Sequence, residues 1–272
     1  MKLISARPIP ASGYIKYLNF VIASITNHST KMRRITSTLA FIMLAKLPSA
    51  QTSVDSVING GIRLTDSVIC TSVKDQAQSP TCWVFGTNSL FESDLIKRYN
   101  TRLNLSEMFI ARYAYIDKAK QFLATGGKTY FEGGGQFHDV IRVVKNYGMV
   151  PEEVYNGRPN EQFSHNHAGL DTAMKRLTYG FLNQGKTILN DDDLGQMNDT
   201  LDKYLGKVPD RFFYKQKPYT PKTFAKEVVK FDDDYVELVS FADKPLYKQF
   251  ILADKYNWAN DSFWNITLDD ML

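Results

Sequence analysis

Residues 73–85 of the 272-residue chain read VKDQAQSPTCWVF, and this stretch sets the expectations for the rest of the chain. Cys82 is followed by Trp83 and opens a run in which apolar residues recur at helical spacing. A helix N-terminus favours negative charge, so a cysteine there is a candidate thiolate nucleophile. Gln76, six residues earlier, offers an amide donor that can stabilise an oxyanion beside the sulfur. The stretch therefore predicts a thiol-acylation site at the start of a helix.

Three helices are expected from this stretch onward. Apolar residues recur at intervals close to 3.6 from Cys82 to about residue 98, which predicts one core helix. Ser106 can cap a second helix that runs to about residue 123. The glycines at 133–135 lead into a third helix, which Gly148 ends.

The second half of the chain becomes more polar after about residue 158. Helices are expected there at about 167–182, at 192–205 and at 221–230. The first convincing strand is residues 235–241, which are rich in tyrosine, valine and phenylalanine.

Composition bears on partners and on redox chemistry. Lys and Arg outnumber Asp and Glu by 33 − 29 = 4, and no basic cluster stands out beyond residues 31–34, so no nucleic-acid partner is expected. Two cysteines are too few for a disulfide framework. Cys70 follows two apolar residues and is expected to be a small buried side chain, although a Cys70–Cys82 disulfide stays open as an alternative.

The first fifty residues contain the pattern of an export signal. After Met32 come two arginines, an apolar run over 35–45 and small residues that end at Ala50. This pattern predicts a signal peptide over about 32–50, cleavage after Ala50 and a periplasmic or secreted protein. The alternative is an uncleaved leader, disordered or membrane-associated, and the protein is cytoplasmic if the leader is not a signal. The run is too short to span a bilayer comfortably, so no stable membrane span is expected. Whether the protein starts at Met1 or Met32 stays open.

The motif at 73–85 resembles that of the papain-like cysteine peptidases. Ser79 stands where papain-type members carry a disulfide cysteine. In this respect the chain resembles the branch of bleomycin hydrolase and aminopeptidase C, which also lacks that cysteine. Residues 105–109, LSEMF, resemble a helix start of the family. Residues 133–137, GGGQF, resemble the glycine segment that lines the family's substrate cleft and hydrogen-bonds the substrate backbone.

This resemblance is close over about residues 66–157, and it implies an α+β papain-like fold with peptidase chemistry on a peptide or protein substrate. It implies no cofactor and no metal, and it leaves open the oligomeric state and the choice between exo- and endopeptidase action. The expected parts are a leader at 1–50, a helical left domain at 51–159, a helical insertion at 160–231 and the start of an incomplete β-rich right domain at 232–272. The implied site residues are Cys82 as nucleophile, Gln76 in the oxyanion hole, and Trp83, Gly133, Gly134 and Gly135 in substrate binding.

The largest departure from the family concerns the general base. The resemblance implies a histidine about 130 to 150 residues beyond the cysteine, followed by an asparagine that orients it. The last histidine, His167, lies only 167 − 82 = 85 residues beyond Cys82. We therefore expect a fragment that stops inside the second domain. The alternatives are an inactive exported remnant or peptide-binding scaffold and, more remotely, another cysteine-dependent acyl transfer.

Four other polar features have plainer interpretations than catalysis or metal binding. His138 stands beside an aspartate at a helix start and is expected to be a satisfied polar residue, with a substitute base as the alternative. His165 and His167 are expected in a solvated loop, because a metal site needs further ligands. The aspartate runs 191–193 and 232–234 lack the spacing of a calcium loop, so helix capping and solvation are expected.

Overall fold

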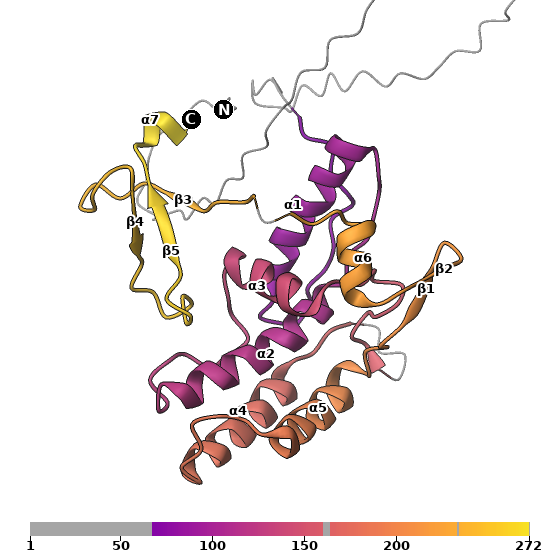
Figure 1. The fold of residues 1–272 in the computed structure, drawn as a ribbon, viewed down its shortest axis with the longest axis vertical. Helices are drawn as coiled ribbons and strands as arrows, with labels where there is room; N and C mark the ends of the chain where they lie inside the picture. Colours follow the sequence, from indigo (N-terminus) through magenta and orange to yellow (C-terminus); the bar gives the residue numbers. More distant parts are fainter. Residues whose placement is uncertain (1–66, 160–163, 233, 272) are drawn as a thin grey trace, which may run out of the picture. The chain divides into compact units, whose positions relative to one another are not determined.

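The computed structural model describes residues 67–159, 164–232 and 234–271 (Figure 1). The described residues from Ile69 onward belong to one compact unit, and a second unit, Ala23–Val68, falls almost entirely outside the described residues. The predicted leader at 1–50 and its cleavage site after Ala50 also lie outside them. No helix in the described ranges is long and apolar enough to cross a membrane.

Helices α1 (Cys82–Tyr99), α2 (Glu107–Ala124) and α3 (Phe137–Tyr147) pack against one another and confirm the three predicted helices. The second of them, α2, is buried over most of its length, which is typical of a central core helix. Its N-terminus is capped as predicted, because the Phe109 N–H donates to Ser106 Oγ at 3.1 Å. The side chain of Phe109 is itself fully buried, so the core lies around the start of this helix.

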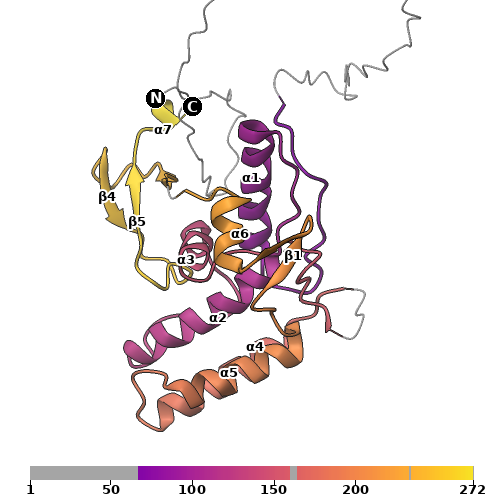
Figure 2. The same ribbon diagram turned by 45° about the vertical axis from the view of Figure 1, so that its right-hand side comes forward.

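Helices α4 (Ala168–Asn183) and α5 (Asp191–Leu205) lie side by side (Figures 1 and 2) and confirm the next two predicted helices. At the start of α5, the Asp193 N–H donates to Asn190 Oδ1 at 2.9 Å, and the Asn190 N–H donates to Asp193 Oδ2 at 3.1 Å. This reciprocal capping box confirms that the aspartate run at 191–193 serves a helix N-terminus.

A short hairpin, β1 (Phe212–Tyr214) with β2 (Lys217–Tyr219), precedes helix α6 (Pro221–Glu227). The sequence pattern predicts α6 but not the hairpin. The two turn residues, Lys215 and Gln216, adopt φ values of 46° and 64°, although such turns prefer glycine, asparagine or aspartate. The turn therefore carries none of the sequence signals by which a hairpin is usually found.

The C-terminal part contains a three-stranded sheet in the order β3-β5-β4. Strand β3 (Leu238–Val239) is parallel to β5 (Ser262–Asn265), and β4 (Lys248–Ile251) is antiparallel to β5. A one-turn helix, α7 (Leu268–Met271), follows. Helices and a small sheet that are segregated along the chain make the fold α+β, as predicted.

The predicted strand at 235–241 is wrong in its extent, because only the two residues of β3 pair with a neighbouring strand. Tyr235 is held by the helical part instead. Its hydroxyl donates to Asp94 Oδ2 at 3.1 Å, and its ring centroid lies 5.2 Å from that of Phe91 in α1. Strand propensity describes a side chain's fit to a half-buried sheet surface, and here packing against a helix outweighs it.

Candidate active site

Short-range hydrogen bonds hold the loop that precedes α1, residues 75–81, which is the nucleophile loop. The Ala77 N–H donates to Asp75 Oδ1 at 2.8 Å, and Ala77 adopts a positive φ of 46°. The buried Ser79 hydroxyl donates to Gln76 O at 2.7 Å. Aspartate and serine side chains stabilise tight turns through such bonds to nearby backbone groups. The loop therefore has a defined conformation where it delivers the chain to α1.

Cys82 is the first residue of α1, as predicted, and it is exposed. The preceding residue, Thr81, begins the helix with its carbonyl oxygen, which accepts from the Val84 N–H at 2.9 Å and the Phe85 N–H at 3.1 Å. Within the described residues, no group forms a hydrogen bond with the Cys82 thiol. The thiol is thus open to solvent at the positive end of an 18-residue helix.

Cys70 is free and exposed, so both the prediction of a buried side chain and the alternative of a Cys70–Cys82 disulfide are wrong. The segment around Cys70 runs along the surface, where Ile69 is 62% exposed and Val73 is fully exposed. Apolar neighbours in the sequence indicated burial, but this segment contacts the core mainly through polar side chains. Two exposed cysteines in one chain offer an internal comparison for the reactivity of Cys82.

The Gln76 side chain lies in the loop before the nucleophile and is half-buried. Its Nε2 donates to Ser79 O at 2.7 Å, which fixes the carboxamide against the loop. A carboxamide has two N–H donors, so one donor beyond this bond is available for an oxyanion. The role of Gln76 in an oxyanion hole stays a prediction.

The glycine segment at 133–135 lies against the nucleophile loop and α1. Trp83 Nε1 donates to Gly133 O at 3.0 Å. A Cβ atom on Gly133 would lie 2.3 Å from Pro80 Cγ, and one on Gly135 would lie 2.9 Å from the Trp83 ring. Real Cβ atoms do not approach so closely, so these positions need glycine because of close contacts. The structure thus brings together the cysteine motif and the glycine segment.

A cavity of about 630 Å³ opens beside these two motifs. Its walls come from α1, from the glycine segment with the start of α3, and from the C-terminal sheet region. Most of its lining is apolar, and the lining includes Trp83, Leu90, Gly135, Phe137, Tyr256 and Phe263. A cavity of this size and character accommodates a small ligand or a few side chains.

A buried charge network that the sequence analysis missed anchors the segment before the loop. Lys74 Nζ lies 2.8 Å from Glu92 Oε1 and 2.7 Å from Glu107 Oε1. Both glutamates are almost fully buried, and Glu92 Oε1 also accepts from the Leu105 N–H at 2.8 Å. Burial raises the pKa of Glu107, while Lys74 opposes that rise. The network joins the first sequence motif to the Leu-Ser-Glu motif at 105–107.

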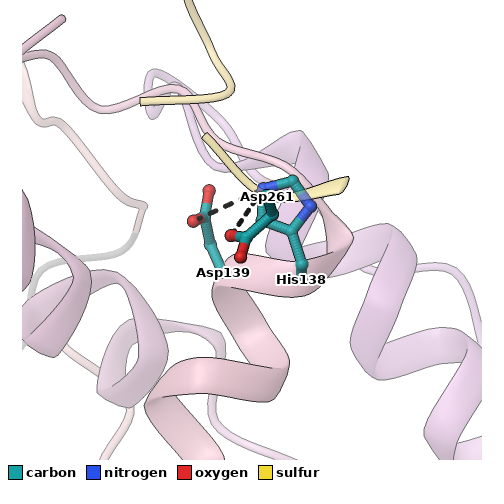
Figure 3. A group of neighbouring side chains, drawn as sticks. All are labelled: His138, Asp139 and Asp261. Carbon is teal, nitrogen blue, oxygen red and sulfur yellow. Dashed lines mark ion pairs between the residues drawn. The ribbon is translucent and has the colours of Figure 1, made fainter. Parts of the chain in front are cut away.

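His138 is held by carboxylates, as expected for a satisfied polar residue (Figure 3). Its Nδ1 lies 2.6 Å from Glu237 Oε2, and its Nε2 lies 3.5 Å from Asp261 and 3.9 Å from Asp139. Burial alone would lower the pKa of His138, but the carboxylates outweigh burial and raise it. Arg142 forms ion pairs with both aspartates. Because a guanidinium already neutralises these carboxylates, the cluster is an ion-pair network that links α3 to the C-terminal region rather than an open metal site.

The prediction of a solvated loop around His165 and His167 is wrong, because the two residues are only 8% and 2% exposed. The Gln78 N–H donates to His165 O at 3.1 Å, and the His167 N–H donates to Gln78 O at 3.0 Å. These two hydrogen bonds join residues 165–167 to the nucleophile loop. Burial lowers the pKa of His167 to about 4. In the part of the chain that the structure describes, neither histidine belongs to a cluster of three potential metal ligands.

The described histidines therefore do not supply the general base. His138 pairs with carboxylates, His165 and His167 anchor the loop through their backbones, and none of the three forms a hydrogen bond with Cys82 in the described ranges.

The fold is α+β, and an exposed cysteine stands at the start of a core helix. A glycine segment and a cavity lie beside that cysteine motif. This combination is similar to that of the papain-like cysteine peptidases.

No protein-family model matches the chain. The chain is 25% identical over 238 residues to aminopeptidase G of Lactobacillus delbrueckii subsp. lactis, across 73% of this chain and 54% of the relative. It is 27% identical over 221 residues to aminopeptidase C of Lactococcus lactis subsp. cremoris, across 65% and 48%. The crystal structure of PepW from Lactobacillus rhamnosis HN001 matches the fold with a TM-score of 0.54 at 20% identity, across 73% of this chain and 54% of PepW.

These similarities relate the chain to the papain-like cysteine peptidases, in the branch of aminopeptidase C and bleomycin hydrolase, and confirm the resemblance seen in its motifs. The chain spans about half the length of the curated relatives that it matches.

Proposed function

We propose that the chain carries the nucleophile and the peptide-binding surface of a cysteine-type peptidase. The observation that carries this proposal is the position of Cys82: exposed, first in α1, and next to a tryptophan that bonds directly to the glycine segment. The relatives are named aminopeptidases. A peptide with a free amino terminus is therefore the proposed substrate.

In the proposed reaction, the Cys82 sulfur attacks the carbonyl carbon of the scissile peptide bond. The Gln76 amide and the Cys82 backbone N–H stabilise the oxyanion of the tetrahedral intermediate. The C–N bond then breaks, the amine leaves with a proton, and a thioester remains on Cys82 until water hydrolyses it. Proton transfer needs an imidazole base. We propose that sequence outside these 272 residues supplies it and that this chain is one part of a longer enzyme.

Comparison of the two cysteines tests the nucleophile. A peptidyl vinyl sulfone should label Cys82 at least ten times faster than Cys70, because only Cys82 lies beside a peptide-binding surface. Iodoacetamide, which has no peptide to bind, should differ less between the two sites. A helix N-terminus alone contributes roughly 0.3–1 kcal/mol, or about two- to fivefold. Mass spectrometry of the labelled peptides measures the labelling rates of Cys82 and Cys70. Equal slow labelling of both cysteines by the vinyl sulfone would overturn the proposal.

A non-catalytic peptide-binding scaffold is the second candidate, and the lack of a histidine at Cys82 among the described residues favours it. Added imidazole distinguishes the two candidates. If the chain is a peptidase part, imidazole should accelerate Cys82-dependent turnover of an activated amino-acid ester, and Cys82→Ala should abolish that increment. If it is a scaffold, a peptide should bind wild type and Cys82→Ala equally in calorimetry, and imidazole should give no such increment.

We also propose export through a signal peptide at about 32–50. The support is the order of basic, apolar and small residues in the sequence. Amino-terminal sequencing of the protein from its native cells should give Gln51 as the first residue. Recovery of only the intact chain, starting at Met1 or Met32, would contradict a signal peptide that is cleaved after Ala50.

A further inference from the structure

Three consecutive carbonyl groups, those of Glu132, Gly133 and Gly134, accept hydrogen bonds from two side chains. Lys118 Nζ, on α2, donates to Glu132 O at 2.7 Å and also to Gly134 O. The carbonyl between them, Gly133 O, accepts from Trp83 Nε1 at 3.0 Å. Lys118 and Trp83 also contact each other, since Nζ lies 5.6 Å from the indole centroid. Two side chains on two helices thus bind every carbonyl from residue 132 to residue 134.

The backbone N–H groups of the glycine segment have no partner in the part of the chain that the structure describes. In a trans peptide the N–H points away from the C=O of the preceding residue. Each carbonyl that is bonded by Lys118 or Trp83 therefore directs the following N–H away from that bond. Within the described residues, the N–H groups of Gly133, Gly134 and Gly135 have no hydrogen-bond acceptor. Gly133 is buried, whereas Gly134 and Gly135 are partly exposed, so the N–H groups of Gly134 and Gly135 are the donors available to the carbonyl oxygens of a peptide.

Lys118 is an unusual residue to find in this position. The residue is 1% exposed, whereas lysine is almost never fully buried unless it is paired. The charged groups that face it are Glu132 beside the glycine segment, Asp139 on α3 and Asp171 on α4. None of these carboxylates forms an ion pair with it among the described residues, so the hydrogen bonds of the ammonium go to backbone carbonyls.

We propose that Lys118 is a positioning residue for peptide binding: its ammonium group holds the carbonyls of the glycine segment so that the segment's amide groups are oriented toward a bound peptide. The proposal rests on the proposed function, because it assigns a role within the same site. Hydrogen bonds from a charged donor are roughly twice as strong as neutral ones. Loss of the charge should therefore loosen the segment even where an N–H donor remains. Burial lowers the pKa of Lys118 to about 8, against the opposing effect of the three carboxylates, so this loss is accessible at mildly alkaline pH.

The first test measures the segment itself and does not depend on chemistry at Cys82. In the full chain labelled with ¹⁵N-glycine, NMR order parameters for Gly133–Gly135 should fall from about 0.8 or more to about 0.6 or less in Lys118→Met. Lys118→Arg should restore them in part, because arginine keeps the charge and the donors. Lys120→Met is the matched control, since Lys120 lies two positions farther along α2 with its side chain 46% exposed. Wild-type order parameters in Lys118→Met would overturn the proposal.

The second test separates positioning from mere support of the fold. The rate at which a peptidyl vinyl sulfone labels Cys82 should fall at least tenfold in Lys118→Met, whereas the iodoacetamide rate should change less than twofold. An unchanged vinyl sulfone rate would overturn the positioning role. If wild type itself shows no preference of the vinyl sulfone for Cys82 over Cys70, the proposed function fails, while the order parameters still decide whether Lys118 holds the segment.

A pH titration covers the case in which Lys118→Met does not fold. In Cys82→Ala, where the thiol cannot titrate, the glycine amide signals of the segment should shift with an inflection near pH 8. Absence of any inflection between pH 7 and pH 10 would overturn the proposal.

Discussion

Two regions next to the nucleophile loop bury titratable side chains, and they respond to burial in opposite ways. Before the loop, Lys74 lies 2.8 Å from Glu92 and 2.7 Å from Glu107, so three charged groups share one network. On the segment that pairs with the loop, His167 is 2% exposed, and neither ring nitrogen has a hydrogen-bond partner among the described residues. A buried charge persists where partners offset its desolvation, and a group without partners is driven to its neutral form.

The pKa values of the two regions express this difference. Burial pulls the pKa of Lys74 down, but Glu107 and Glu92 together outweigh burial and leave that pKa raised. Burial lowers the pKa of His167 to about 4, and the neighbouring His165 adds to the effect. The stability of the first region therefore depends on the charge of Lys74, and that of the second depends on a neutral His167. Removal of the lysine charge should destabilise the first region, and protonation of the histidine should destabilise the second.

The largest effect is expected from Lys74→Met. The substitution leaves Glu92 and Glu107 buried without their cation, and breaking a buried ion pair in this way costs roughly 3–5 kcal/mol of unfolding free energy. Denaturant unfolding at pH 7 measures the loss. Lys97→Met, at an exposed position on α1, is the control and should change stability by less than about 0.5 kcal/mol.

The pH dependence of that loss sharpens the prediction. Burial already raises the pKa of Glu107, and without Lys74 nothing opposes that rise, so the variant loses stability as pH rises and regains it as pH falls. The deficit relative to wild type should therefore be smaller at pH 5 than at pH 7. A deficit that is independent of pH would show that Lys74 contributes packing rather than charge.

A somewhat smaller effect is expected from acid titration of His167. Its folded pKa of about 4 lies below the ordinary histidine pKa of 6.5, so the unfolded chain binds a proton first. The stability that comes from the neutral ring is present above pH 6.5 and is lost as pH falls toward 4. At about 1.4 kcal/mol per pKa unit, this loss amounts to roughly 3 kcal/mol at most.

His167→Leu should remove that part of the acid sensitivity, because leucine fills a similar volume and cannot bind a proton. Unfolding free energies at pH 7, 5.5 and 4 measure the effect in wild type and variant. If both lose stability equally over this range, the ring of His167 is not buried in its neutral form.

Local patterns account for the predictions that hold. Helical periodicity and capping residues lie within a few positions of each other, so α1, α2 and α5 are readable from the sequence. Cys82 and the glycine segment were recognised because their spacing and composition form short motifs. Their contact through Trp83 follows from the family's fold rather than from any local pattern.

The features that the sequence analysis missed are nonlocal. Glu92 and Glu107 fall on two different helices, and nothing near either residue shows that Lys74 reaches both. A lysine within a helix is normally expected on the solvent-exposed face. The burial of Lys118 is not visible in the sequence, because its partners are backbone carbonyls, which every residue carries. His167 was expected in water because its polar neighbours suggested a loop, but a backbone bridge to Gln78 buries it.

His138 offers the smallest predicted effect, and it differs from His167 in the direction of its pKa shift: its side chain is 12% exposed and its pKa is raised, whereas the pKa of His167 is lowered. Burial would lower its pKa, but Glu237, Asp139 and Asp261 raise it. The stability that comes from its charged form is fully present below pH 6.5 and is lost as pH rises through the folded pKa. His138→Gln should therefore cost more at pH 5.5 than at pH 8.5, by about 1 kcal/mol or less, the range of partly exposed ion pairs. In the double variant with His167→Leu, both histidine contributions should vanish from the profile between pH 5 and 8. If His138→Gln costs more at the higher pH, the carboxylates do not hold its charge.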